Sequence, residues 1–223
     1  MRENQPKHRQ IARERARIER REAWRREAGS ALLVCEGACT EPHYLKGLRA
    51  YLGINPANVE IVEGGTKSNA VAVVRRAMDR FAHAPRDRVF VVVDAEQGDL
   101  DRALELCRTP LQRRNRRKGL PEIRIEPIVS IPCFEFWLLL HFRYCDQPFA
   151  NFAGLLPKLR ASLPNYSKGD ARIFDKVGGG EGLLRALDNA AKLRQALAAT
   201  GAKRPATDMD KLVEALREIV PPA

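Results

Sequence analysis

The chain has 223 residues and a formal net charge of +11, and 44% of its residues are hydrophobic. That apolar share is enough for a core and argues against full-length disorder, and the length fits one domain with or without a helical extension. No apolar run approaches the roughly 20 residues needed to span a bilayer, and the arginine-rich start lacks the apolar stretch of a secretory signal. Five cysteines without CxxC spacing favour buried, reduced thiols over a zinc site, so we expect a cytoplasmic protein.

The positive charge is concentrated in two short segments. Residues 1–30 hold ten basic and five acidic residues, and residues 108–118 hold six basic residues and no acidic one. The remainder of the chain is neutral, so these two segments account for the whole excess. Such clusters indicate a polyanionic partner, with nucleic acid as the first candidate. The residues that we expect to contact nucleic acid are Arg113, Arg114, Arg116, Arg117 and Lys118.

The first predicted element is a helix over residues 13–28. It carries few large apolar side chains among many charges, which is too little for a buried face, so we interpret it as a basic arm that is solvated or bound to a partner. The Gly–Ser pair at residues 29–30 ends it.

From residue 31, short apolar runs alternate with helical stretches. The predicted strands cover residues 31–35, 58–62, 88–94 and 123–129, and the helices between them cover residues 41–52, 68–81 and 100–107. The third strand, RVFVVVD, is continuous and β-branched, which is typical of a strand covered on both faces. This alternation predicts an α/β, Rossmann-like fold with a mostly parallel four-stranded sheet and right-handed crossovers.

After residue 130 the pattern becomes helical. Helices are predicted over residues 134–142, 152–162, 182–199 and 209–219. The three glycines at residues 178–180 lack the lysine spacing of a phosphate-binding loop, and we interpret them as a flexible linker. The predicted organisation is therefore a basic arm (1–29), an α/β core (30–130) and a helical C-terminal part packed on the core (131–223).

Carboxylates follow two of the predicted strands. Glu36 comes directly after the first strand, Asp94 closes the third, and Glu96 lies two residues further on. If these strands are neighbours, the three side chains meet at the carboxyl edge of the sheet, where ligands of open parallel sheets bind. Oxygen ligands of this kind suit Mg²⁺ or Mn²⁺, which activates water and stabilises charge on a phosphate. The alternative is that these acids only cap the helices that follow.

Three further polar residues could belong to this edge. Glu41 stands in the first turn of a predicted helix with Thr40 as its N-cap, so it either contacts metal or substrate or only stabilises the helix. Glu135 lies in the apolar run PCFEFWLLL, where a charge is costly unless it is paired or bound to a metal. His141 does not share a face with Glu135 on an ideal helix, and we interpret it as a hydrogen-bonded core residue.

The segments LLVCEGACTEPHYLKGL, VVVDAEQ and SIPCFEFWLLLHF, followed by PNYSKG at residues 164–169 and by the stretch at 206–213, resemble the RloB-like family of bacterial and archaeal proteins. The resemblance covers residues 30–218, and the motifs stand in the family's order. It implies a Toprim-like fold, the metal-binding module of topoisomerases, primases and related nucleases, and a place in restriction-modification and anti-phage defence gene neighbourhoods.

The resemblance also implies roles for particular residues. The Toprim pattern is a glutamate after the first strand and Asp-x-Asp after the third, so Glu36 matches as metal ligand or general acid/base, and Asp94 matches as a Mg²⁺ ligand. Glu96 stands where the pattern has a second aspartate, with Asp99 and Asp101 nearby as substitutes. Lys168 lies in the PNYSKG motif, either as a solvated side chain or as a cation for the phosphoryl transition state.

Two functions follow from these patterns. The first is a Mg²⁺- or Mn²⁺-dependent nuclease acting on RNA, including tRNA, or on DNA, with Glu36, Glu135 and Lys168 as catalytic residues and Glu36, Asp94 and Glu96 as metal ligands. The second is a nucleic-acid-binding or sensor subunit that works with a defence partner protein and whose carboxylates are structural. A homo-oligomer is compatible with either.

Overall fold

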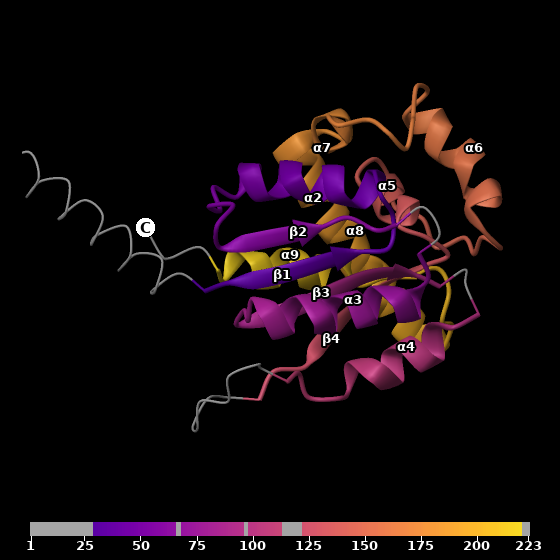
Figure 1. Cartoon of the computed structure of the whole chain (residues 1–223). Coiled ribbons are helices and arrows are strands. Elements are labelled where there is room, and N and C mark those ends of the chain that lie inside the picture. Colours follow the sequence, from indigo (N-terminus) through magenta and orange to yellow (C-terminus); the bar gives the residue numbers. More distant parts are fainter. Residues whose placement is uncertain (1–28, 66–67, 96–97, 113–121, 220–223) are drawn as a thin grey trace, which may run out of the picture.

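A computed structural model describes residues 29–65, 68–95, 98–112 and 122–219 of the chain (Figure 1). Their centre is a five-stranded sheet with the strand order β2-β1-β3-β4-β5. The first four strands run parallel, and β5 runs antiparallel to β4. The strands are β1 (Ala31–Cys35), β2 (Val59–Val62), β3 (Arg88–Asp94), β4 (Ile125–Ile131) and β5 (Ala206–Thr207). The α/β class and the mostly parallel sheet are confirmed, whereas the expected number of four strands is wrong.

Helices connect and cover the strands. They are α2 (Thr40–Tyr51), α3 (Ala70–His83), α4 (Leu100–Cys107), α5 (Glu135–Leu140), α6 (Phe152–Ser162), α7 (Ile173–Lys176), α8 (Gly179–Thr200) and α9 (Met209–Arg217). None in the described ranges combines the length and apolarity needed to cross a membrane. Residues 1–28 of the predicted basic arm, Glu96 and the cluster Arg113, Arg114, Arg116, Arg117 and Lys118 lie outside the described residues.

Two departures from the sequence-based expectation concern the C-terminal half. The glycines at 178–180 are not a linker, because Gly178 adopts a left-handed conformation (φ 96°) and is the N-cap of α8, which begins at Gly179. A positive φ strains any residue with a Cβ, which explains a glycine at that cap. The second departure is β5, whose two residues pair with Ser130 and Ile131 at the end of β4.

The sheet is covered on both faces, as the β-branched pattern predicted. Alternate residues of β1 and β3 pack into two separate cores: Leu32 and Val91 lie with α3 and α4, while Leu33 and Val92 lie with α2, α5 and the later helices. Figure 1 shows α3 and α4 on one side of the sheet and α2 and α7 on the other. Because the side-chain period of a strand is two, both faces are apolar and polar groups are displaced to the strand ends.

The loops after β1 and β2 cross at the carboxyl edge. The Gly64 N–H donates to the carbonyl of Gly37 at 2.9 Å. A Cβ on Gly64 would lie 1.7 Å from the carbonyl oxygen of Glu36, so only glycine fits between the two backbones. This contact fixes the loop that carries Glu36.

A carboxylate pocket at the carboxyl edge of the sheet

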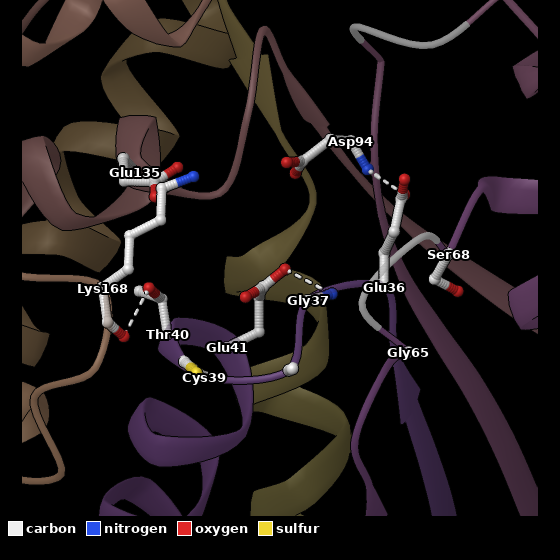
Figure 2. Close-up of a pocket in the computed structure, with 11 residues that line it drawn as sticks. Glu36, Gly37, Cys39, Thr40, Glu41, Gly65, Ser68, Asp94, Glu135 and Lys168 are labelled. Atoms are coloured by element: carbon white, nitrogen blue, oxygen red, sulfur yellow. Dashed lines mark hydrogen bonds and ion pairs between the residues drawn. The ribbon is translucent and has the colours of Figure 1, made fainter.

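A pocket of about 360 Å³ opens where the parallel strands end (Figure 2). The titratable carboxyl groups that line it are Glu36, Glu41, Asp94 and Glu135. Lys168 is the one lysine or arginine among the described residues of the lining. Figure 2 shows Asp94 and Glu41 directed into a common space, with Glu135 and Lys168 on one side and Glu36 on the other.

Glu36 and Asp94 are held next to each other by the pairing of β1 with β3. The register aligns Cys35 with Val92, and the Glu36 N–H donates to the Val92 carbonyl at 3.0 Å. The Glu36 carboxylate then accepts from the Asp94 N–H at 3.1 Å. Asp94 Oδ1 in turn accepts from the N–H of Phe134 at 2.8 Å, which connects β3 to the segment after β4. The adjacency on which the sequence argument depended is therefore present.

Glu41 lines the same pocket, although it stands in the first turn of α2. Its Oε1 accepts from the Gly37 N–H at 3.0 Å, and the residue is only 7% exposed. The expectation that Thr40 caps this helix is wrong: Cys39 occupies the N-cap and makes no side-chain cap hydrogen bond. The Thr40 hydroxyl donates instead to the Lys168 carbonyl at 3.1 Å.

Glu135 and Lys168 form an ion pair across the pocket wall. Lys168 Nζ lies 3.4 Å from Glu135 Oε1 and 4.1 Å from the ring centroid of Phe152, and the Tyr166 hydroxyl donates to the same carboxylate oxygen at 2.7 Å. Glu135 is 3% exposed. The internal ion pair that the sequence left open as an alternative is thus formed, and it lies in the pocket lining together with the other carboxylates.

The pocket lining holds more acidic than basic side chains, and burial together with this excess of acid shifts the pKa values of several of its residues. Burial, followed by the charges of Glu41, Glu135 and Glu36, raises the pKa of Asp94 from 3.8 to about 9. Burial and then Glu135 also raise the pKa of Glu41. Burial lowers the pKa of Lys168, but the neighbouring Glu135 carboxylate outweighs this and leaves it raised. A cation in the pocket would relieve the repulsion among these groups.

The donor chemistry of the pocket fits a hard divalent cation, since every titratable acid in its lining offers carboxylate oxygen. Asp94 Oδ1 is bound to a backbone amide, while Asp94 Oδ2 accepts no hydrogen bond from a described residue. Within the described ranges, however, no three His, Cys, Asp or Glu side chains are gathered closely enough to hold a metal ion as they stand. Glu96, the third expected ligand, lies outside those ranges.

The other residues considered from the sequence lie away from the pocket centre. His141 is fully buried, its Nε2 lies 3.0 Å from the Tyr44 hydroxyl, and burial lowers its pKa to about 3, so the core interpretation is confirmed. All five cysteines are free in the structure, and four of them are buried. Asp99, considered as a substitute ligand, accepts instead from the Val71 N–H at 3.2 Å.

Two residues that hydrogen-bond to the pocket lining were not found from the sequence: Tyr166, and Thr40 as the donor to the Lys168 carbonyl. Tyr166 is 7% exposed and donates a hydrogen bond to Glu135. The hydroxyls of Thr40 and Tyr166 lie 3.3 Å apart. A signal was available, because a tyrosine stands inside the polar motif PNYSKG, where a large aromatic residue has little reason to be unless it packs inward.

These features define a class: an α/β protein with a mostly parallel sheet and an acidic pocket at the carboxyl ends of its strands. The family model described as RloB-like protein matches residues 31–216, from β1 to α9. The chain therefore belongs to the RloB-like family. No curated protein and no solved structure matches it.

Proposed function

We propose that this chain is a metal-dependent nuclease with a Toprim-like fold that hydrolyses phosphodiester bonds in nucleic acid. The observation that carries the proposal is the convergence of Glu36, Glu41, Asp94 and Glu135 in one pocket at the ends of parallel strands. Such crowding costs stability, and it is typical of sites that bind a cation or carry out a reaction.

Each residue has a defined task under this proposal. Glu36 and Asp94 hold the cation, with Glu96 as the third ligand of the Toprim pattern. Mg²⁺ or Mn²⁺, when bound, supplies a water of lowered pKa and stabilises negative charge on the phosphate. Lys168 donates hydrogen bonds to a phosphate oxygen, and Glu135 holds the lysine and accepts a proton in the pocket.

The substrate is RNA, including tRNA, or DNA. Both are included because none of the residues named for binding recognises a base, so these residues do not favour one nucleic acid over the other. The basic stretch at residues 108–118 supplies phosphate contacts, and the family resemblance supports a role as an anti-phage or abortive-infection effector. A defence partner protein would restrain or trigger the activity.

The test is cleavage of plasmid DNA and of tRNA by the purified chain with Mg²⁺ or Mn²⁺. We expect Glu36→Gln and Asp94→Asn each to lower the rate by at least about 100-fold, the scale of losing one group that stabilises the transition state. Glu214→Gln, an exposed acid on α9, is the matched control and should cleave normally. Equal rates in all four proteins would show that these carboxylates do not act in cleavage.

One observation favours the alternative of a non-catalytic nucleic-acid-binding or sensor subunit. Glu36, Glu41 and Asp94 each accept a hydrogen bond from a backbone N–H, which is also what structural carboxylates do. In that case nucleic acid would bind without being cut, and divalent metal would not change the thermal stability of the chain.

A further inference from the structure

A second hollow lies between α3 and α4, on the face of the sheet opposite to α2. Its volume is about 600 Å³, and its charged lining consists of Arg75, Arg76, Arg102, Asp79 and Asp99. Both helices begin at the carboxyl edge of the sheet (Figure 1), and the groove lining extends along α3 from Asn69 to Asp79.

Arg76 connects the groove to the pocket. Its Nη1 donates to the Glu63 carbonyl at 3.0 Å, and its Nη2 lies within 3.4 Å of where a Cβ on Gly65 would stand. Gly65 and Ser68 line the carboxylate pocket, and Asn69, the next residue, lines the groove. The two hollows therefore lie next to each other at the start of α3.

The positive charge of the groove is available to a ligand. Arg75 and Arg102 are exposed, and neither makes a hydrogen bond or ion pair with its side chain to any described residue. Arg80, one turn along α3, differs in that it pairs with Glu60. Exposed arginines that lack acidic partners suit phosphate groups, which guanidinium binds with paired hydrogen bonds.

The two aspartates reduce the positive charge of the groove but do not cancel it. Asp99 Oδ2 accepts from the Val71 N–H at 3.2 Å, so its charge faces the first turn of α3. Asp79 stands one turn beyond Arg75, at the far part of the groove lining. Three arginines against two aspartates leave a net positive groove directly beside a strongly acidic pocket.

We propose that this groove binds the phosphate backbone of the nucleic acid strand next to the position held in the carboxylate pocket. Arg75 and Arg102 make the phosphate contacts, and Arg76 lies between the groove and Gly65 of the pocket lining. The choice of nucleic acid as ligand rests on the proposed function. The groove is built on α3 and α4, which pack against the sheet.

The test measures binding without cleavage. Fluorescence anisotropy of a labelled single-stranded RNA and of a labelled duplex DNA is recorded with the full chain in EDTA, over a range of salt concentrations. The variant R75A/R102A is compared with R143A/R217A, which removes two exposed arginines on the opposite side of the sheet that have no side-chain partner among the described residues.

We expect R75A/R102A to weaken binding on the order of tenfold for each arginine at 0.1 M salt, and to reduce the slope of log affinity against log salt by about 2 for duplex DNA. The control should keep its affinity and slope. R75K/R102K, which preserves the charge but not the paired hydrogen bonds, should keep the salt slope of wild type and lose less affinity than R75A/R102A. Matching thermal melts show that the variants are folded.

Equal losses in R75A/R102A and R143A/R217A, or no loss in either, would overturn the groove proposal, as would absence of binding by the wild-type chain. Because binding in EDTA needs no metal, this outcome is separate from the nuclease test: a chain that binds through the groove but never cleaves would refute the proposed function alone.

Discussion

Charged side chains are paired at the amino edge of the sheet and crowded with like charges at its carboxyl edge. At the amino edge, Arg88 makes two hydrogen bonds to Glu126, at 2.9 and 2.7 Å, and a third to Glu218 at 2.9 Å. Asp87 accepts from both the backbone and the hydroxyl of Ser30, at 2.9 and 2.6 Å. These charged groups therefore face an opposite charge or a hydrogen-bond donor, as structural groups do.

At the carboxyl edge, four carboxyl groups face one lysine among the described residues, and the pKa of Asp94 rises to about 9 because of burial and these neighbours. At the amino edge, then, the fold pairs its charged side chains with partners of its own. Under the proposed function, the imbalance at the other end is a binding site for a cation, maintained at the expense of stability.

The largest expected effect concerns the backbone crossing that holds the carboxyl edge together. Gly64→Ala would place a methyl group 1.7 Å from the Glu36 carbonyl oxygen. We expect a loss of about 3 kcal/mol or more in the free energy of unfolding, because neither backbone can move without disturbing β1 or β2.

The amino-edge counterpart is Gly29→Ala, whose new Cβ would meet Ile219 at an ordinary 3.8 Å. That variant should stay within about 0.5 kcal/mol of wild type in urea denaturation. Similar losses for the two variants would mean that the crossing is not a rigid feature of the carboxyl edge.

The second prediction concerns pH and uses Asp94→Asn without metal. The pKa of Asp94 is about 9 in the folded chain and near 3.8 when it is unfolded, so the wild type should lose stability as pH rises through this window. The asparagine variant does not titrate and can still accept from the Phe134 N–H.

Asp94→Asn should therefore be more stable than wild type at pH 8, by about 2 kcal/mol or more, with a smaller difference at pH 5. Denaturant midpoints at the two pH values measure this. A variant less stable than wild type at pH 8 would indicate that Asp94 is a structural carboxylate like those of the amino edge.

A smaller effect is expected for the hydroxyl that supports Glu135. Tyr166→Phe removes a 2.7 Å hydrogen bond to a carboxylate that is 3% exposed, and we expect a loss of about 1 to 2 kcal/mol. Tyr144→Phe, which loses a 3.4 Å contact to Asp146 at the surface, should be neutral in the same thermal melts. A neutral Tyr166→Phe would show that the ion pair with Lys168 satisfies Glu135 without help.

The smallest effect is expected at the amino edge itself. Arg88→Met breaks ion pairs in which the side chains are 31% to 74% exposed, so solvent screening limits the loss to about 1 kcal/mol or less. Stabilisation of this variant by Mg²⁺ or Mn²⁺ should equal that of wild type. A different stabilisation by metal would contradict the expectation that the amino edge and the carboxylate pocket are independent.

The sequence was sufficient where a signal is local. The strand Arg88–Asp94 has the predicted bounds because a continuous β-branched run has few other interpretations, and Ala31–Cys35 and Leu100–Cys107 agree as well. Placing Glu36 beside Asp94 needed one assumption, that β1 and β3 are neighbours, and the described pairing meets it.

The sequence was insufficient where local structure depends on residues that are distant along the chain. The two-residue β5 has no periodicity of its own and exists only because it pairs with the end of β4. Thr40 looked like a helix cap, but a loop 128 residues away offers its hydroxyl a better acceptor. The sequence left open whether Glu41 contacts a ligand or only stabilises the helix, and only the fold of the loop from Gly37 places it in the pocket lining.

The most direct test of the account is calorimetric titration of the metal-free chain with Mn²⁺ and Mg²⁺. We expect saturable binding to the wild type and binding at least about tenfold weaker in Asp94→Asn, which removes a carboxylate from the pocket. Glu214→Gln, which leaves the pocket intact, should bind like the wild type. Identical titrations for the three proteins, or no heat of binding in any, would contradict the claim that this pocket exists to hold a divalent cation.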